Sequence, residues 1–115
     1  MTDLFFDIQQ GNIIRKINSD GFLHVNWAVI RDTQCYPDKF EPIKLDPIIL
    51  GRFTKLIMEN DDWCHFNIAQ FDLWYAKSSN ITNVHVNGQF LTELIYLHDF
   101  QNLYKIITKK EILFF

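Results

Sequence analysis

Residues 63–77, WCHFNIAQFDLWYAK, decide the fold of this chain. They predict two β-strands, 63–68 (WCHFNI) and 70–77 (QFDLWYAK). Only Ala69 separates the two strands, so we expect either a tight turn or a bulge that bends one strand. Strands joined this closely pair antiparallel, which makes an antiparallel sheet the frame for the remaining elements.

The segment after these strands continues the same pattern. Residues 83–87 (NVHVN) alternate between apolar and polar, which indicates a strand, and Asn87-Gly88 is typical of the turn that closes it. Residues 90–97 predict either a strand or the start of a helix. Residues 98–108 predict a helix with an apolar stripe.

The segment before residue 63 predicts another helix. Asp46 is a strong N-cap residue, and Pro47 suits the first helical position because its missing N–H has no partner there. We expect this helix to run to about Glu59. The polar stretch 31–45, which contains Pro37 and Pro42, predicts a loop.

Three N-terminal segments, 4–9, 13–18 and 22–30, predict an antiparallel meander, with a turn at 10–12. The predicted order is therefore βββ-α-βββ-α. It indicates an α+β fold, with an antiparallel sheet of about six strands and two helices packed on one face. The length of 115 residues predicts a single domain, 1–115.

Composition excludes several classes of function. The formal net charge is −3, which leaves no basic surface for duplex nucleic acid. Two cysteines are too few for a disulfide scaffold, and the start, MTDLFF, lacks the basic segment of a signal peptide. We therefore expect a cytoplasmic protein that does not enter a membrane. The high aromatic content and the apolar tail 112–115 (ILFF) favour a homo-oligomer.

Three tripeptides place a histidine and an asparagine on the same face of a strand, two residues apart. If these strands are neighbours, their polar face could bind a nucleobase or a sugar, with a tryptophan as stacking platform. The predicted ligand-binding residues are His24, Asn26, His65, Asn67, Trp74, His85 and Asn87. Such residues are also ordinary on the solvated face of an antiparallel sheet.

Evidence for catalysis in the sequence is weak. Three imidazoles could bind a metal, but no ligand spacing such as His-Glu-x-x-His is present. Cys64 and His65 are adjacent strand residues, so their side chains face opposite ways. We predict no catalytic residue, no metal and no cofactor. A small metal-dependent or hydrolytic enzyme using His24, His65 and His85 is the alternative.

The C-terminal helix has a polar stripe at helical spacing, formed by His98, Gln101, Asn102 and Lys105. The stripe could be a recognition face for a partner. Alternatively, His98 and Asp99 cap the helix and the rest of the stripe faces water.

Residues 96–104 (YLHDFQNLY), followed by Thr108 and Glu111-Ile112, resemble a known ending. The ending is Tyr-Val-His-x-Leu-Gln-Asn-Leu-Tyr…Leu-Thr-Gly-x-Glu-Leu, found in small uncharacterised proteins of Bacteroidota genomes, prophages and phages. Lys109 stands where that family has glycine, so we expect a different helix C-cap. The resemblance implies a small accessory protein that is phage-borne, and it brings no activity with it.

These observations favour a small non-enzymatic binding or inhibitor protein, encoded by a phage or prophage. It would act in the host cytoplasm on a host defence factor, by binding a protein or by sequestering a small nucleotide-like ligand. A structural or assembly subunit that uses the tail 112–115 is a further alternative.

Overall fold

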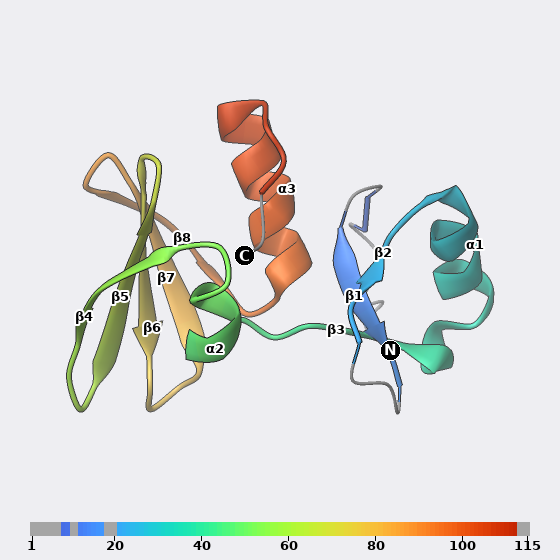
Figure 1. Cartoon of the computed structure of the whole chain (residues 1–115), viewed down its shortest axis with the longest axis horizontal. Coiled ribbons are helices and arrows are strands. Elements are labelled where there is room, and N and C mark those ends of the chain that lie inside the picture. Colours follow the sequence, from blue (N-terminus) through green and yellow to red (C-terminus); the bar gives the residue numbers. More distant parts are fainter. Residues whose placement is uncertain (1–7, 10–11, 18–20, 113–115) are drawn as a thin grey trace. The chain divides into compact units, whose positions relative to one another are not determined.

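The computed structural model describes residues 8–9, 12–17 and 21–112. They divide into two compact units, shown in Figure 1. The first unit contains the described residues up to Ile43 together with Tyr96–Ile112, and the second contains Lys44–Ile95. The predicted α+β class with antiparallel strands is confirmed, and the strands are shared between a three-stranded and a five-stranded sheet. The single domain stays a prediction.

The first unit is built around a central strand. β1 pairs antiparallel with β2 on one side and with β3 on the other. One helix, α1, packs Val29 and Ile30 against a buried cluster that includes Ile14 of β1, and α3 also contacts β1. The elements are β1 Ile13–Lys16, β2 Leu23–His24, α1 Trp27–Cys35, a 3-10 turn Pro37–Lys39, β3 Phe40–Pro42 and α3 Leu97–Thr108.

The predicted strand 22–30 is wrong beyond His24. The Asn26 side chain accepts a hydrogen bond from the Val29 N–H at 3.0 Å, which makes Asn26 the N-cap of α1. Val25 and Val29 both contact the Ile14 cluster. Their four-residue spacing suits a helix as well as a strand, so the alternation could not separate the two.

Two more N-terminal predictions change. Of the predicted strand 4–9, residues 4–7 lie outside the described residues, and Ile8 and Gln9 are not in a strand. The Gln9 N–H donates to Asn12 Oδ1 at 2.7 Å, and the Asn12 N–H donates to the Gln9 carbonyl at 3.1 Å. The other two residues of the predicted turn 10–12 lie outside the description. The predicted loop 31–45 contains the end of α1 and the strand β3.

The second unit is a meander in which each strand pairs with the next, in the order β4-β5-β6-β7-β8. The predicted strands at 63–68 and 70–77 are confirmed. Of residues 90–97, the segment up to Leu94 belongs to a strand and Leu97 begins α3. The elements are α2 Pro47–Leu50, β4 Lys55–Glu59, β5 Trp63–Ile68, β6 Phe71–Ala76, β7 Ile81–Val86 and β8 Gln89–Leu94.

Two tight turns close this meander. Ala69 adopts a positive φ of 52° between β5 and β6, so the tight turn is the correct alternative there. Asn87 and Gly88 have φ values of 52° and 83°, as a two-residue hairpin turn requires. These turns set the register that places side chains of β5, β6 and β7 beside one another.

The predicted helix 46–59 is correct only at its start. Asp46 Oδ1 accepts from the Ile49 N–H at 2.8 Å, which confirms the cap, but the helix ends at Leu50. Residues Lys55–Glu59 instead form β4, at the edge of the sheet beside β5. Pairing with β5 outweighs the local helical preference of this segment.

The two faces of the five-stranded sheet differ. One face is apolar and buried, and its members include Cys64, Phe66, Phe71, Leu73 and Val84. Ile49 and Leu50 of α2 are buried in the same unit. The residues between these along each strand point to the opposite face, which is only partly covered.

Candidate functional site

The open face of the five-stranded sheet carries polar and aromatic side chains in register. His65, Trp74 and Asn83 are cross-strand neighbours on β5, β6 and β7. Asn67, Asp72 and His85 form the next row on the same three strands. Directly paired side chains lie close enough to interact, so these six form one surface.

Four of these six side chains are already engaged in internal contacts. The His65 ring stacks on the Trp74 ring at 4.0 Å between centroids and 8° between planes. His65 Nε2 lies 2.9 Å from Asp72 Oδ1. The Asn67 amide donates to the Phe71 carbonyl at 3.0 Å. These polar groups therefore have partners before any ligand arrives.

The remaining two, Asn83 and His85, line a shallow pocket of about 350 Å³ together with Trp63 and Trp74. Trp63 stands edge-on to Trp74 at 6.4 Å and 83°. The Asn83 amide has no hydrogen bond to any other described residue. His85 Nδ1 is buried and lacks a partner as well, a state that costs about 1–3 kcal/mol per group. The pocket thus combines indole surface with hydrogen-bonding groups that have no internal partner.

The side chains of the pocket are suited to contact a planar polar ring. Indole faces stack on planar rings, and an amide offers a donor and an acceptor side by side. Among the described residues, the lining contains no cysteine, serine or carboxylate side chain. Within the described part of the chain, no group of three or more His, Cys, Asp or Glu residues could hold a metal ion.

The predicted seven-residue face is only partly assembled. His65, Asn67, Trp74 and His85 do share one face, but His24 is an exposed residue of β2 in the other unit. Its tripeptide partner, Asn26, caps a helix instead of lying on a strand. The predicted face of three histidines on one sheet is therefore wrong, because the strand at His24 ends after two residues. Asn87 lies in the turn after β7.

Two pocket residues, Trp63 and Asn83, are missing from the sequence prediction. Each lies two residues before a predicted histidine, His65 or His85, and so shares its strand face. That parity is the signal that could have identified them. The search for His-x-Asn tripeptides passed over them because neither belongs to one.

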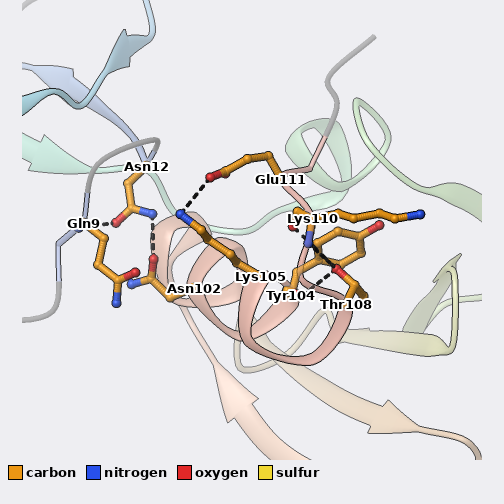
Figure 2. A network of polar contacts seen from close by, with 8 residues as sticks. All are labelled: Gln9, Asn12, Asn102, Tyr104, Lys105, Thr108, Lys110 and Glu111. Atoms are coloured by element: carbon orange, nitrogen blue, oxygen red, sulfur yellow. Dashed lines mark hydrogen bonds and ion pairs between the residues drawn. The ribbon is translucent and has the colours of Figure 1, made fainter.

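The polar stripe on α3 is mostly buried, so the prediction of an outward recognition face is not supported. Figure 2 shows two of its members, Asn102 and Lys105, with their partners. Gln101 Oε1 accepts from the Ile13 N–H at 2.8 Å. The Asn12 amide donates to Asn102 Oδ1 at 2.7 Å. His98 is also buried. Lys105 is exposed and forms an ion pair with Glu111 at 3.0 Å. The buried amides join α3 to β1 and its preceding turn, which is a structural task.

The end of α3 is closed by local contacts, also visible in Figure 2. Thr108 Oγ1 donates to the Tyr104 carbonyl at 2.7 Å and accepts from the Lys110 N–H at 3.2 Å. Lys109 adopts the left-handed conformation, φ 63°, and its N–H donates to the Lys105 carbonyl. The lysine thus takes the conformation that glycine usually takes at this position. Ile112 is buried, and the rest of the tail lies outside the described residues.

The two cysteines differ in exposure, and neither lines the pocket. Cys64 is buried on the apolar face, and burial, assisted by the Glu59 carboxylate, raises the pKa of its thiol. The thiol therefore stays protonated and poorly nucleophilic. Cys35 is exposed at the end of α1.

No protein-family model, curated protein or solved structure matches this chain. Over the described residues, every helix is too short or too polar to span a bilayer.

Proposed function

We propose that this protein is a small binding protein that acts by occupancy, and that it holds a planar polar ring in the pocket of Trp63, Trp74, Asn83 and His85. One observation carries the proposal. On a single sheet face, His65 and Asn67 have internal partners, whereas the Asn83 amide has no hydrogen bond to another described residue and lines the pocket. Such an amide can donate to and accept from a ligand without giving up an internal hydrogen bond.

The energetics of such a site are adequate for a small ligand. Stacking of a ring on an aromatic side chain contributes about 1–3 kcal/mol. A hydrogen bond to the Asn83 amide would add about 0.5–1.5 kcal/mol. Together these terms correspond to a Kd in the millimolar range or weaker, so the pocket would fill only when its ligand is abundant.

A comparison of two asparagines on the same face tests the proposal. Amide NMR resonances of the pocket residues should shift when adenosine or nicotinamide, two planar polar rings, is added to the full chain at millimolar concentration. Asn83→Ala should weaken that response because it removes the pocket amide, while Asn67→Ala should retain it because Asn67 bonds internally. An equal response from both folded variants would contradict the pocket assignment.

The setting of this activity is also a proposal. The resemblance of residues 96–112 to phage-associated proteins supports a phage- or prophage-encoded protein that acts on a host defence factor in the host cytoplasm. A ligand-sequestering protein would act there by removing a small molecule on which the factor depends. The enzyme alternative loses its support because His24 does not share a sheet with His65 and His85.

A second candidate function is self-association through β4. This strand is an edge of the sheet, all five of its residues are exposed, and Leu56, Ile57 and Met58 lie in sequence on it. Edge strands with apolar side chains readily pair with another strand. Two copies paired antiparallel about Ile57 would place Lys55 opposite Glu59. Light scattering should then report a dimer that Ile57→Lys converts to a folded monomer, and a wild-type monomer at all concentrations would exclude it.

A further inference from the structure

We infer that the ring bound in this pocket is an uncharged nucleobase, taken as a free base or nucleoside, and that a phosphate group weakens its binding. The inference rests on the proposed function and names the ligand class for the same site. It follows from how Trp74 is stacked, from what Asn83 offers and from the charges beside the pocket.

One face of Trp74 remains available to a flat ring. His65, on β5, covers one side of the indole in a parallel stack at 4.0 Å. Because β6 lies between β5 and β7, the opposite side of the indole turns toward β7, where Asn83 is its direct neighbour. A planar ring stacked there has the Asn83 amide beside it.

The Asn83 amide matches the edge of a base. An asparagine amide presents one acceptor and one donor in a plane, and it pairs with two adjacent polar atoms on a base edge. No other described residue forms a hydrogen bond with this amide. The His85 ring stands at the same pocket with Nδ1 unpartnered. The Asn83 amide can therefore bind a base edge without rearrangement of existing hydrogen bonds.

The charges beside the pocket disfavour phosphate. In the part of the chain that the structure describes, no lysine or arginine lines the pocket. Two carboxylates flank it instead, because Asp72 is the cross-strand neighbour of His85 and Glu93 is the neighbour of Asn83. Lys55 of β4 lies in the same row as His85, as the cross-strand neighbour of Asn67. Asn67 and Asp72 stand between this lysine and His85. A dianionic phosphate would thus meet like charge and no compensating cation.

The test compares ligands that differ only in phosphate. Adenosine, guanosine, cytidine and uridine, and their 5′-monophosphates, are titrated into the full chain at low salt, with tryptophan fluorescence and amide NMR shifts as readouts. At least one nucleoside should shift the resonances of residues lining the pocket. Its monophosphate should bind roughly threefold or more weakly, and added salt should reduce that difference.

A charge variant tests whether a carboxylate beside the pocket causes the weaker binding of the monophosphate. Glu93→Gln should improve binding of the monophosphate while leaving the nucleoside unchanged. Asp61→Asn, which changes the net charge equally but lies in the turn between β4 and β5, should alter neither. Tighter binding of the monophosphate than of the nucleoside in the wild-type chain would overturn the inference.

A planar ring that is not a nucleobase separates the proposed function from the nucleobase inference. If nicotinamide shifts the pocket resonances and no nucleoside does, the pocket stands as a site for planar rings and the nucleobase inference fails. If neither class of ligand shifts them, the proposed function fails together with the inference.

Discussion

The two units of this molecule use polar side chains in opposite ways. In the first unit, buried amides on α3 satisfy groups far away in the sequence, as in the bonds from Asn12 to Asn102 and from Ile13 to Gln101. In the second unit, every strand pairs with its neighbour in the chain. Its unpartnered amide, Asn83, lies on an open surface. The first unit uses polar groups to join distant segments, whereas the second leaves polar groups available to a ligand.

The two units also differ in how their segments are arranged along the chain, and this arrangement affects how they fold. Over the described residues the second unit is one continuous segment, and a hydrogen bond from the Leu45 N–H to the Ile95 carbonyl, at 2.7 Å, joins its two ends. The first unit is discontinuous and needs α3 from beyond the second. Folds with local pairing close short loops, whereas folds with distant pairing must close long ones first.

The largest expected effect comes from cutting the chain between the units. The segment Lys44–Ile95 should fold by itself, with cooperative thermal unfolding followed by circular dichroism, because its sheet needs no strand from elsewhere. Residues 1–43 should remain unfolded, since they lack α3. Failure of Lys44–Ile95 to fold would show that the second unit depends on the first.

Removal of one large core side chain from each unit sharpens the comparison. Phe100 of α3 and Phe71 of β6 are both fully buried. Truncation of either to alanine should cost about 3–5 kcal/mol. We expect Phe100→Ala to broaden or shift NMR signals of the first unit and Phe71→Ala those of the second. Simultaneous loss of both sets in each variant would indicate a single cooperative unit.

A smaller effect is expected from a buried amide. Gln101→Leu keeps the approximate size of the side chain but removes the acceptor for the Ile13 N–H. A buried donor left without a partner costs about 1–3 kcal/mol. Urea unfolding of the full chain should show this loss, and Ile106→Gln, at an exposed position of the same helix, should serve as the neutral control. A Gln101→Leu variant as stable as wild type would contradict the structural assignment of the stripe.

A substitution at the C-terminal end of α3 should increase the stability of the protein. Lys109 adopts a left-handed conformation that a side chain disfavours by about 1–2 kcal/mol. Lys109→Gly removes that strain and adds freedom to the unfolded chain, so the net gain in stability should be up to about 1 kcal/mol. The melting temperature should rise slightly. Lys110→Gly, one residue later, should give no such gain.

The smallest effect concerns the ion pair between Lys77 and Glu59, at 2.9 Å on the surface of the second unit. The hydrogen bond between them lowers the pKa of Glu59 and raises the pKa of Lys77. The pair therefore stabilises the fold at neutral pH. That contribution is lost as the pH falls through the Glu59 pKa or rises through the Lys77 pKa. Lys77→Met should be slightly less stable at pH 7 in low salt, and the difference should vanish at pH 2 and in high salt.

The parts that were predictable from the sequence are those decided by neighbouring residues. Asn87-Gly88, the strands around Ala69 and the cap at Asp46 follow from local turn and cap chemistry. The helix at Trp27 and the strand at Lys55 depend on tertiary partners, Ile14 and β5, that no local pattern names. Spacing alone left both segments open to either structure.

The candidate site shows the same limit. Strand parity placed His65, Asn67, Trp74 and His85 on one face correctly, because side chains alternate along a strand. Parity does not say which polar groups find internal partners. That depends on the pairing of β5, β6 and β7, which joins His65 to Asp72 and leaves Asn83 without one. Burial of the α3 stripe was hidden for the same reason, since its partner, Ile13, lies far away in the sequence.

The discontinuity of the first unit has a consequence during synthesis on the ribosome. Residues up to Ile43 emerge first, yet α3 begins only at Leu97. At a synthesis rate of roughly 5–20 residues per second, several seconds pass between the synthesis of the first segment and that of α3. During that interval Ile13 and its neighbours lack the cover that α3 later supplies, while the inserted sheet is completed. The second unit can therefore fold before the first unit is complete. The apolar segment around Ile13 is then the part of the nascent chain that is exposed to a chaperone.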